Sequence, residues 1–193
     1  MSEPEGFNTF DKKPPQEQLA KLLEHYQSGL FNQAENLAIT LTQEFPEHPF
    51  GWKVLGALLR NKGRKLDALR VNKRVADLSP QDAEAQNNFA SSLQDLGKLE
   101  EALASLKRAV TLKSDFPEAH YNMGNALREL SRFEEAETSY KRAVLLKGEF
   151  AQAFNNLGTT LKILGKNEEA EANLRKAIDL LPNYVEAYNN LGI

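Results

Sequence analysis

Four asparagines recur at a fixed interval of 34 residues along the chain. They are Asn88, just before the midpoint of the chain, and Asn122, Asn156 and Asn190 after it. An asparagine amide offers one acceptor and two donors, so it can pair with both the N–H and the C=O of a peptide backbone. A row of such amides on one face would hold an extended chain with little regard to its side chains.

The row also has a structural interpretation, because an amide can bond to neighbouring groups and fix the packing of one helix against another. The sequence leaves both interpretations open. If the row grips a ligand, removing Asn122 and Asn156 should weaken binding and leave thermal stability almost unchanged. The polar residues expected to contact the ligand are Asn87, Asn88, Tyr121, Asn122, Asn125, Arg128, Asn155, Asn156, Lys162, Asn189 and Asn190.

The same interval governs the small residues of the whole chain. A constant period of about 20–50 residues is typical of stacked repeat arrays. Within each period, apolar residues follow helical spacing over two segments, and no segment shows the alternation of a β-strand. The small residues in step are Ala34, Ala68, Ala102, Ala136 and Ala170, and Gly29, Gly63, Gly97 and Gly165, with Ser131 at the remaining place.

The repeat period divides the chain into a tail and an array. Residues 1–14, which are interrupted by proline and glycine, are expected to form a flexible N-terminal tail. The first copy of the array is the least regular, as terminal repeats often are because one face meets water. The expected copies are 15–48, 49–82, 83–116, 117–150, 151–184 and a partial sixth repeat, 185–193.

The partial sixth repeat ends within a first helix, without a polar closing helix. We therefore expect apolar surface to be exposed near Leu174, Ile178, Tyr188 and Leu191. Such a surface predicts that two chains associate through the uncapped C-terminal end.

Small residues at fixed places explain how the helices pack. Gly56, Ala90, Gly124 and Gly158 lie midway along the predicted first helices. Helix axes lie roughly 8–10 Å apart, and a side chain of one carbon or none permits the close end of that range. A single helix pair cannot bury its apolar face, so neighbouring pairs must stack.

The pattern resembles that of tetratricopeptide repeat (TPR) proteins. The resemblance covers residues 15–193 and implies an all-α, right-handed superhelical solenoid of antiparallel helix pairs. It also implies that the first helices line a concave surface, so the asparagine row belongs there and would bind a protein or an extended peptide. The residues that match best are Trp52, Leu55, Gly56, Leu59, Ala68, Val75 and Pro80, and Phe154, Leu157, Gly158, Leu161, Ala170, Leu174, Ala177 and Pro182.

Within that family, the row is similar to the superhelical arrays of O-linked N-acetylglucosamine transferases and their bacterial relatives. The opening of the array, with LLEHYQSGLFNQAENLA and then HPFGWKVLGALL, also resembles bacterial proteins of that architecture. This resemblance implies an alternative function as the substrate-recognition arm of a larger glycosyltransferase. The carboxylate clamp of chaperone-binding members is matched only at Lys53 and Asn88, so we do not expect chaperone-tail binding.

Catalysis within this chain is not expected. The three histidines share no repeat place, and His120 stands where other copies have Trp52 and Phe154, which indicates packing. Glutamate pairs such as Glu134 and Glu135 recur at the starts of second helices, where negative charge suits the helix dipole. The sequence has no glycine-rich phosphate loop and no cysteine, and we expect neither a cofactor nor a metal.

Composition favours a water-soluble protein. Of 193 residues, 41% are hydrophobic and 26% charged, with a formal net charge of −3. An acidic balance argues against nucleic acid as a partner, and no apolar run approaches the about 18 residues that a membrane-spanning helix needs. The charged N-terminus lacks the apolar core of a secretory signal, so the expected location is the cytoplasm.

Overall fold

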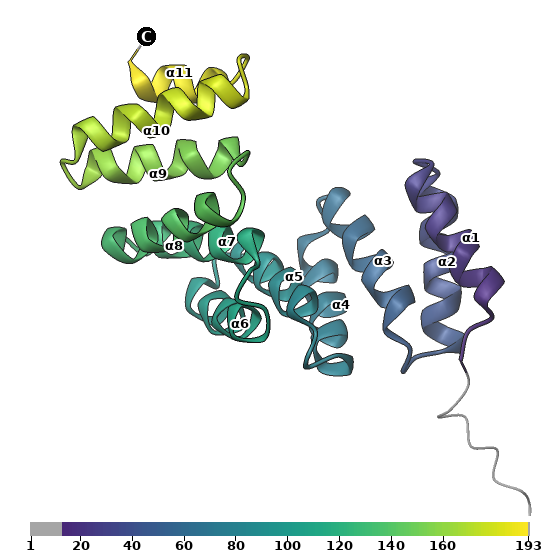
Figure 1. The fold of residues 1–193 in the computed structure, drawn as a ribbon. Helices are drawn as coiled ribbons and strands as arrows, with labels where there is room; N and C mark the ends of the chain where they lie inside the picture. Colours follow the sequence, from purple (N-terminus) through teal and green to yellow (C-terminus); the bar gives the residue numbers. More distant parts are fainter. Residues whose placement is uncertain (1–12, 193) are drawn as a thin grey trace, which may run out of the picture. The chain divides into compact units, whose positions relative to one another are not determined.

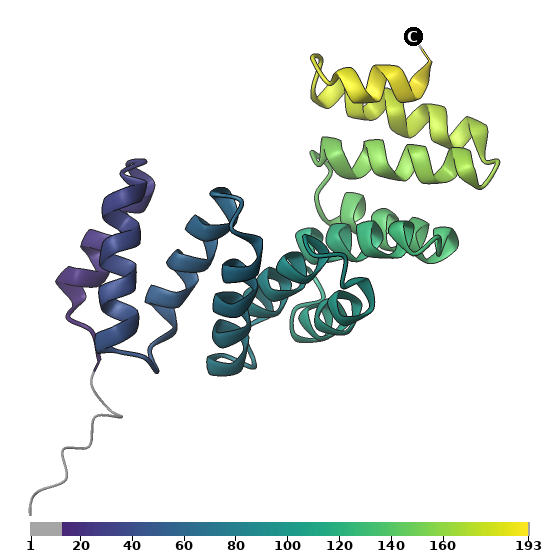
Figure 2. The ribbon, with the colours of Figure 1, turned by 180° about the vertical axis from the view of Figure 1, so that it is seen from behind.

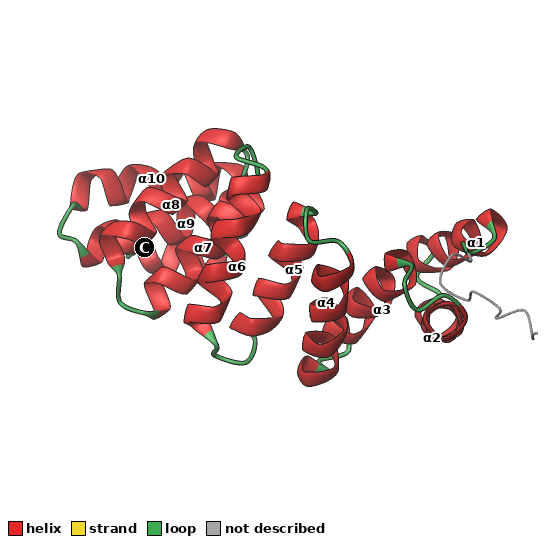
Figure 3. Ribbon diagram, turned by 90° about the horizontal axis from the view of Figure 1, so that it is seen from below, coloured by secondary structure: helices red, strands yellow, loops and turns green. Residues whose placement is uncertain are grey.

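The computed structural model describes residues 13–192, and all of the secondary structure in that range is α-helical (Figure 3). The predicted all-α fold class is therefore confirmed. The predicted tail lies outside the described residues except for its last two positions. The helices are α1 (Gln16–Gln27), α2 (Phe31–Glu44), α3 (Pro49–Asn61), α4 (Lys65–Leu78), α5 (Ala83–Gln94), α6 (Leu99–Leu112), α7 (Pro117–Glu129), α8 (Phe133–Leu146), α9 (Ala151–Ile163), α10 (Asn167–Leu180) and α11 (Val185–Leu191).

The described residues fall into two compact units, 13–80 and 81–192. The first holds α1 to α4 and the second holds α5 to α11 (Figure 1). Within each unit, every helix packs against the next one along the chain. In the second unit the first helices of the pairs, α5, α7, α9 and α11, also contact one another in turn. Figure 2 shows the same helices from behind. Contacts among its second helices are weaker, so the first helices form the inner layer of a curved stack.

Glycines midway along the first helices receive a large side chain from the second helix of the same pair. A Cβ atom at Gly124 would lie 2.6 Å from Cδ1 of Tyr140, and one at Gly158 would lie 2.7 Å from Cγ of Leu174. Tyr140 and Leu174 are themselves fully buried. These distances are too short for any real Cβ atom, so the predicted role of the small residues in close helix packing is confirmed.

His120 takes over the packing role of a tryptophan. The indole nitrogen Nε1 of Trp52 donates to the carbonyl oxygen of Pro46 at 2.9 Å. At the matching place two repeats later, Nε2 of His120 lies 3.1 Å from the carbonyl oxygen of Ser114. Burial lowers the pKa of His120, which favours a neutral ring whose Nε2 proton points at this carbonyl. The prediction that His120 serves packing agrees with this geometry.

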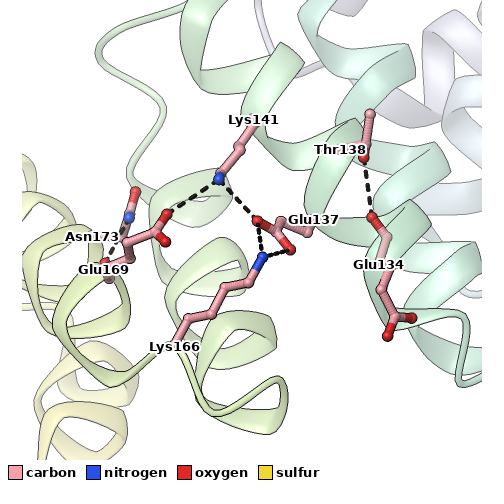
Figure 4. Close-up of polar contacts among 7 residues, drawn as sticks. All are labelled: Glu134, Glu137, Thr138, Lys141, Lys166, Glu169 and Asn173. Atoms are coloured by element: carbon pink, nitrogen blue, oxygen red, sulfur yellow. Dashed lines mark hydrogen bonds and ion pairs between the residues drawn. The ribbon is translucent and has the colours of Figure 1, made fainter.

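Ion pairs join second helices on the outer side of the second unit, as Figure 4 shows for α8 and α10. The carboxylate of Glu137 accepts from Lys141 at 2.8 Å and from Lys166 at 2.8 Å, and Lys141 also lies 3.1 Å from Glu169. We call these four residues the outer ion cluster. Burial alone would raise the pKa of Glu137, but bonds from both lysines and their charges outweigh it, so the pKa lies below its ordinary value of 4.5.

The expected exposure of apolar residues near the C-terminal end is wrong in part. Leu174 is only 1% exposed because it packs against Gly158. Ile178, Tyr188 and Leu191 are half-buried, since α11 packs on α9 and α10. Association of two chains through this end stays a prediction.

The turns between first and second helices require left-handed backbone. Gly29, Gly63, Gly97 and Gly165 have φ between 71° and 74°, and Ser131 adopts the same conformation with φ of 60°. A side chain makes this conformation unfavourable by about 1–2 kcal/mol, and glycine does not. A Cβ atom at Gly97 would meet nothing within 4 Å, so the backbone conformation alone accounts for glycine there.

Ser131→Gly should therefore stabilise the protein by about 0.5–1 kcal/mol, because the relief of strain exceeds the entropy that glycine loses on folding. Gly97→Ser is the matched control and should destabilise it by about 1 kcal/mol. Urea denaturation measures both changes. A stabilising Gly97→Ser would contradict the argument.

Glu137→Gln should reduce the dependence of stability on pH. A carboxyl group whose pKa falls on folding stabilises the folded state above its unfolded pKa, and this contribution is lost as pH falls through the folded pKa. The wild-type protein should therefore lose stability from about pH 5 downward, and the variant should lose less. Urea denaturation at pH 7, 5 and 3 tests this, with Glu168→Gln as control because Glu168 is exposed. Parallel curves for all three proteins would refute the assignment.

Candidate functional site

The asparagine row lies on the inner layer of the second unit, with one residue on each of α5, α7, α9 and α11. Each of the last three donates back to the preceding first helix. The amide nitrogen of Asn122 lies 2.9 Å from Oδ1 of Asn87 and 3.3 Å from Oγ of Ser91. These bonds join α7 to α5 and form the first rung of what we call the asparagine ladder.

The next two rungs repeat this geometry. Nδ2 of Asn156 donates to Oδ1 of Asn125 at 2.9 Å and to the hydroxyl of Tyr121 at 3.3 Å, which joins α9 to α7. Nδ2 of Asn190 donates to Oδ1 of Asn155 at 2.9 Å, which joins α11 to α9. The ladder is therefore continuous from α5 to α11.

A buried tyrosine ties the ladder to the core. The hydroxyl of Tyr140 on α8 donates to Oδ1 of Asn125 at 2.7 Å, the same oxygen that accepts from Asn156. Burial raises the pKa of Tyr140 far above its ordinary value of 10.0, so the hydroxyl stays protonated and remains a donor. Asn125 is thus held from two sides, and its side chain has a defined orientation on the inner face.

A second set of bonds fastens backbone carbonyls along the same face. Nε2 of Gln94 donates to the carbonyl oxygen of Asn122 at 2.9 Å, and Nζ of Lys162 donates to that of Asn190 at 2.6 Å. Arg128 occupies the equivalent position of the repeat between Gln94 and Lys162. Its side chain, however, forms no hydrogen bond or ion pair with any residue in the range 13–192. Arg128 as a whole is half-buried, and its charge acts on Tyr140 and Tyr184.

The structure brings together most of the predicted site residues. The ladder and its carbonyl bonds use Asn87, Tyr121, Asn122, Asn125, Asn155, Asn156, Lys162 and Asn190, whereas Asn88 and Asn189 are exposed. Sequence reasoning missed Tyr140 and Glu186, whose carboxylate accepts from Nδ2 of Asn155 at 3.1 Å. Tyr140 stands where other copies have Leu106 and Leu174. A tyrosine at a position that is leucine in the other copies could have indicated a buried hydroxyl with a hydrogen-bond partner.

These bonds revise the expectation for the loss of asparagines. Because Asn122 and Asn156 join neighbouring helices, their removal should lower stability in addition to any effect on a ligand. The packing interpretation of the row is therefore supported for the amide nitrogens. Oδ1 of Asn122, by contrast, takes part in none of the rungs.

Three family models of tetratricopeptide repeats match the chain. Two described as tetratricopeptide repeat match residues 19–83 and 115–183, and one described as TPR repeat matches residues 90–130. A comparison with curated protein sequences gives no significant match. Among the described residues, no helix has the length and apolar character to cross a membrane.

Solved structures of TPR proteins share the fold. MamA of Desulfovibrio magneticus is 19% identical, with 86% of this chain and 97% of that chain covered and a TM-score of 0.73. YrrB, a TPR protein with an unusual peptide-binding site, is 19% identical, with 91% of each chain covered and a TM-score of 0.73. TTC0263, a TPR protein of Thermus thermophilus, is 22% identical, with 91% and 96% covered and a TM-score of 0.72. At these identities the similarity concerns the fold.

Asn156→Ala should destabilise the protein by about 1–3 kcal/mol, because it removes three side-chain hydrogen bonds, to Tyr121, Asn125 and Asn155, and leaves these partners less well satisfied. Asn189→Ala is the matched control on the neighbouring helix. Asn189 is exposed, so its removal should change stability by no more than about 0.5 kcal/mol. Urea denaturation compares the two variants, and equal losses would contradict a role of Asn156 in holding α9 to α7.

Proposed function

This chain belongs to the tetratricopeptide repeat family, and we propose that the inner face of its second unit binds an extended peptide segment of a partner protein. The single observation that carries the proposal is that different atoms of the ladder residues have different roles. Amide nitrogens hold the helices together, while Oδ1 of Asn122 and the guanidinium of Arg128 remain available.

The two available groups have complementary chemistry. A carboxamide oxygen accepts from a peptide N–H, and a guanidinium donates to a peptide C=O. Asn122 and Arg128 lie on the same helix, α7, six residues apart. The ladder fixes the orientation of the Asn122 side chain, so less conformational entropy is lost there when a ligand binds.

The energetics favour weak, reversible binding. Each hydrogen bond contributes about 0.5–1.5 kcal/mol net, and association and ordering costs offset much of the total. A short peptide should therefore bind with a dissociation constant on the order of micromolar to millimolar.

The array also supports a second proposal, as the substrate-recognition arm of a larger glycosyltransferase. The observation that favours it is the continuity of the asparagine ladder across all first helices of the second unit. The scaffold itself acts without catalysis in either case. The complete gene, read downstream of residue 193, distinguishes the two proposals.

Backbone recognition can be tested without altering the protein. A peptide selected on an array with the full chain would be N-methylated at alternate backbone amides, in two complementary patterns. One pattern should weaken binding at least tenfold, because it removes the N–H groups that face the carboxamides, while the other should change it little. Isothermal titration calorimetry measures both. Equal affinities for the unmodified and both methylated peptides would exclude backbone recognition.

A further inference from the structure

The outer side of the second unit contains two successive junctions between second helices that differ at one decisive place. Between α8 and α10, Glu137 is the centre of the outer ion cluster (Figure 4). Between α6 and α8, the same repeat place is Leu103. Both side chains are buried, with exposed fractions of 7% and 2%, so each determines the chemistry of its junction.

Leu103 prevents a second ion cluster. Lys107 corresponds to Lys141, but among the described residues it has no ion-pair partner, because a leucine replaces the acid that would accept from it. Arg132, which corresponds to Lys166, instead makes two hydrogen bonds of 2.7 Å to Glu135. The charge of Lys107 contributes only at longer range to the lowered pKa of Glu135, behind the hydrogen bonds from Arg132. Glu135 is therefore neutralised by Arg132, whereas the ammonium group of Lys107 has its donors free of any acid.

An apolar groove remains where the ion cluster is missing. Its volume is about 510 Å³, which lies within the roughly 300–1,000 Å³ range of ligand pockets. Leu103, Met123 and Leu127 line it, from α6 and α7. Lys107 and Glu135 also line it, from α6 and α8. We call this cavity the outer groove.

We propose that the outer groove binds a peptide segment of a partner protein that carries large aliphatic side chains next to a carboxylate. The aliphatic side chains would displace water from the apolar lining. The carboxylate would pair with Lys107, the charge in the groove that lacks an ion-pair partner. This site does not depend on the proposed function of the inner face, since it is formed by side chains of α6, α7 and α8 and none of its lining residues belongs to the ladder.

Met123 provides a direct probe of this site. The chain has two methionines, Met1 and Met123, so the full chain labelled with ¹³C at the methionine methyl groups should give two methyl signals. The first probe is the acetylated, amidated tetrapeptide Glu-Leu-Leu-Glu. It should shift the Met123 signal in a saturable manner and leave the Met1 signal unchanged. The peptides Lys-Leu-Leu-Lys and Glu-Ser-Ser-Glu should bind at least fivefold more weakly.

Three variants test the assignment of the lining. Leu103→Glu places an acid beside Lys107, as in the next junction, and should reduce binding of Glu-Leu-Leu-Glu at least tenfold. Glu137→Leu is the matched control, since it alters the α8–α10 junction and should leave the Met123 response intact. Lys107→Glu should reverse the preference, so that Lys-Leu-Leu-Lys binds better than Glu-Leu-Leu-Glu.

Three results would overturn the proposal, and a fourth distinguishes this site from the inner face. Equal binding of the three peptides, or an unmoved Met123 signal at saturating Glu-Leu-Leu-Glu, would overturn the proposal. An unchanged preference in Lys107→Glu would do the same, even if Leu103→Glu failed to fold. Binding of the inner-face peptide should be unaffected by Lys107→Glu, so failure of one site is distinguishable from failure of the other.

Discussion

The close approach of two helices within each pair is the constraint on which the rest of the structure depends. Gly124 and Gly158 leave room for Tyr140 and Leu174, which would otherwise collide with the first helix. This contact fixes the position of each second helix along the first helix of its pair. With that register set in every repeat, successive first helices come near enough for their side chains to bond directly.

The two layers of the second unit use different polar chemistry to join repeats. Neutral amides make the rungs between first helices, with Lys162 and Glu186 adding charged donors and acceptors between α9 and α11, whereas ion pairs connect α8 to α10. Exposed ion pairs weaken as salt screens them, whereas hydrogen bonds between neutral groups do not depend on that screening. The inner layer should therefore keep its geometry over a wide range of ionic strength, while the outer junctions respond to it.

Much of this architecture could be predicted from the sequence because repetition makes it visible. The interval between alanines located the helix pairs, and the glycine places located the turns, including Ser131 in the left-handed conformation. The partners of the ladder could not be predicted, because they depend on distances between side chains 31 or 35 residues apart. The roles of Tyr140 and Leu103 could not be predicted either, since each depends on the residue that faces it on a neighbouring helix.

The rungs of the ladder all run the same way, from the amide nitrogen of a later helix to an acceptor on the earlier one. The side chains of Asn122, Asn156 and Asn190 therefore all point in one direction along the stack, and the surface that they form differs between its two directions. A peptide and the same peptide laid in the reverse direction would meet non-equivalent groups. A peptide of the kind proposed for this face would therefore be favoured in one orientation, from its amino to its carboxyl end, by hydrogen bonds that also hold the helices together.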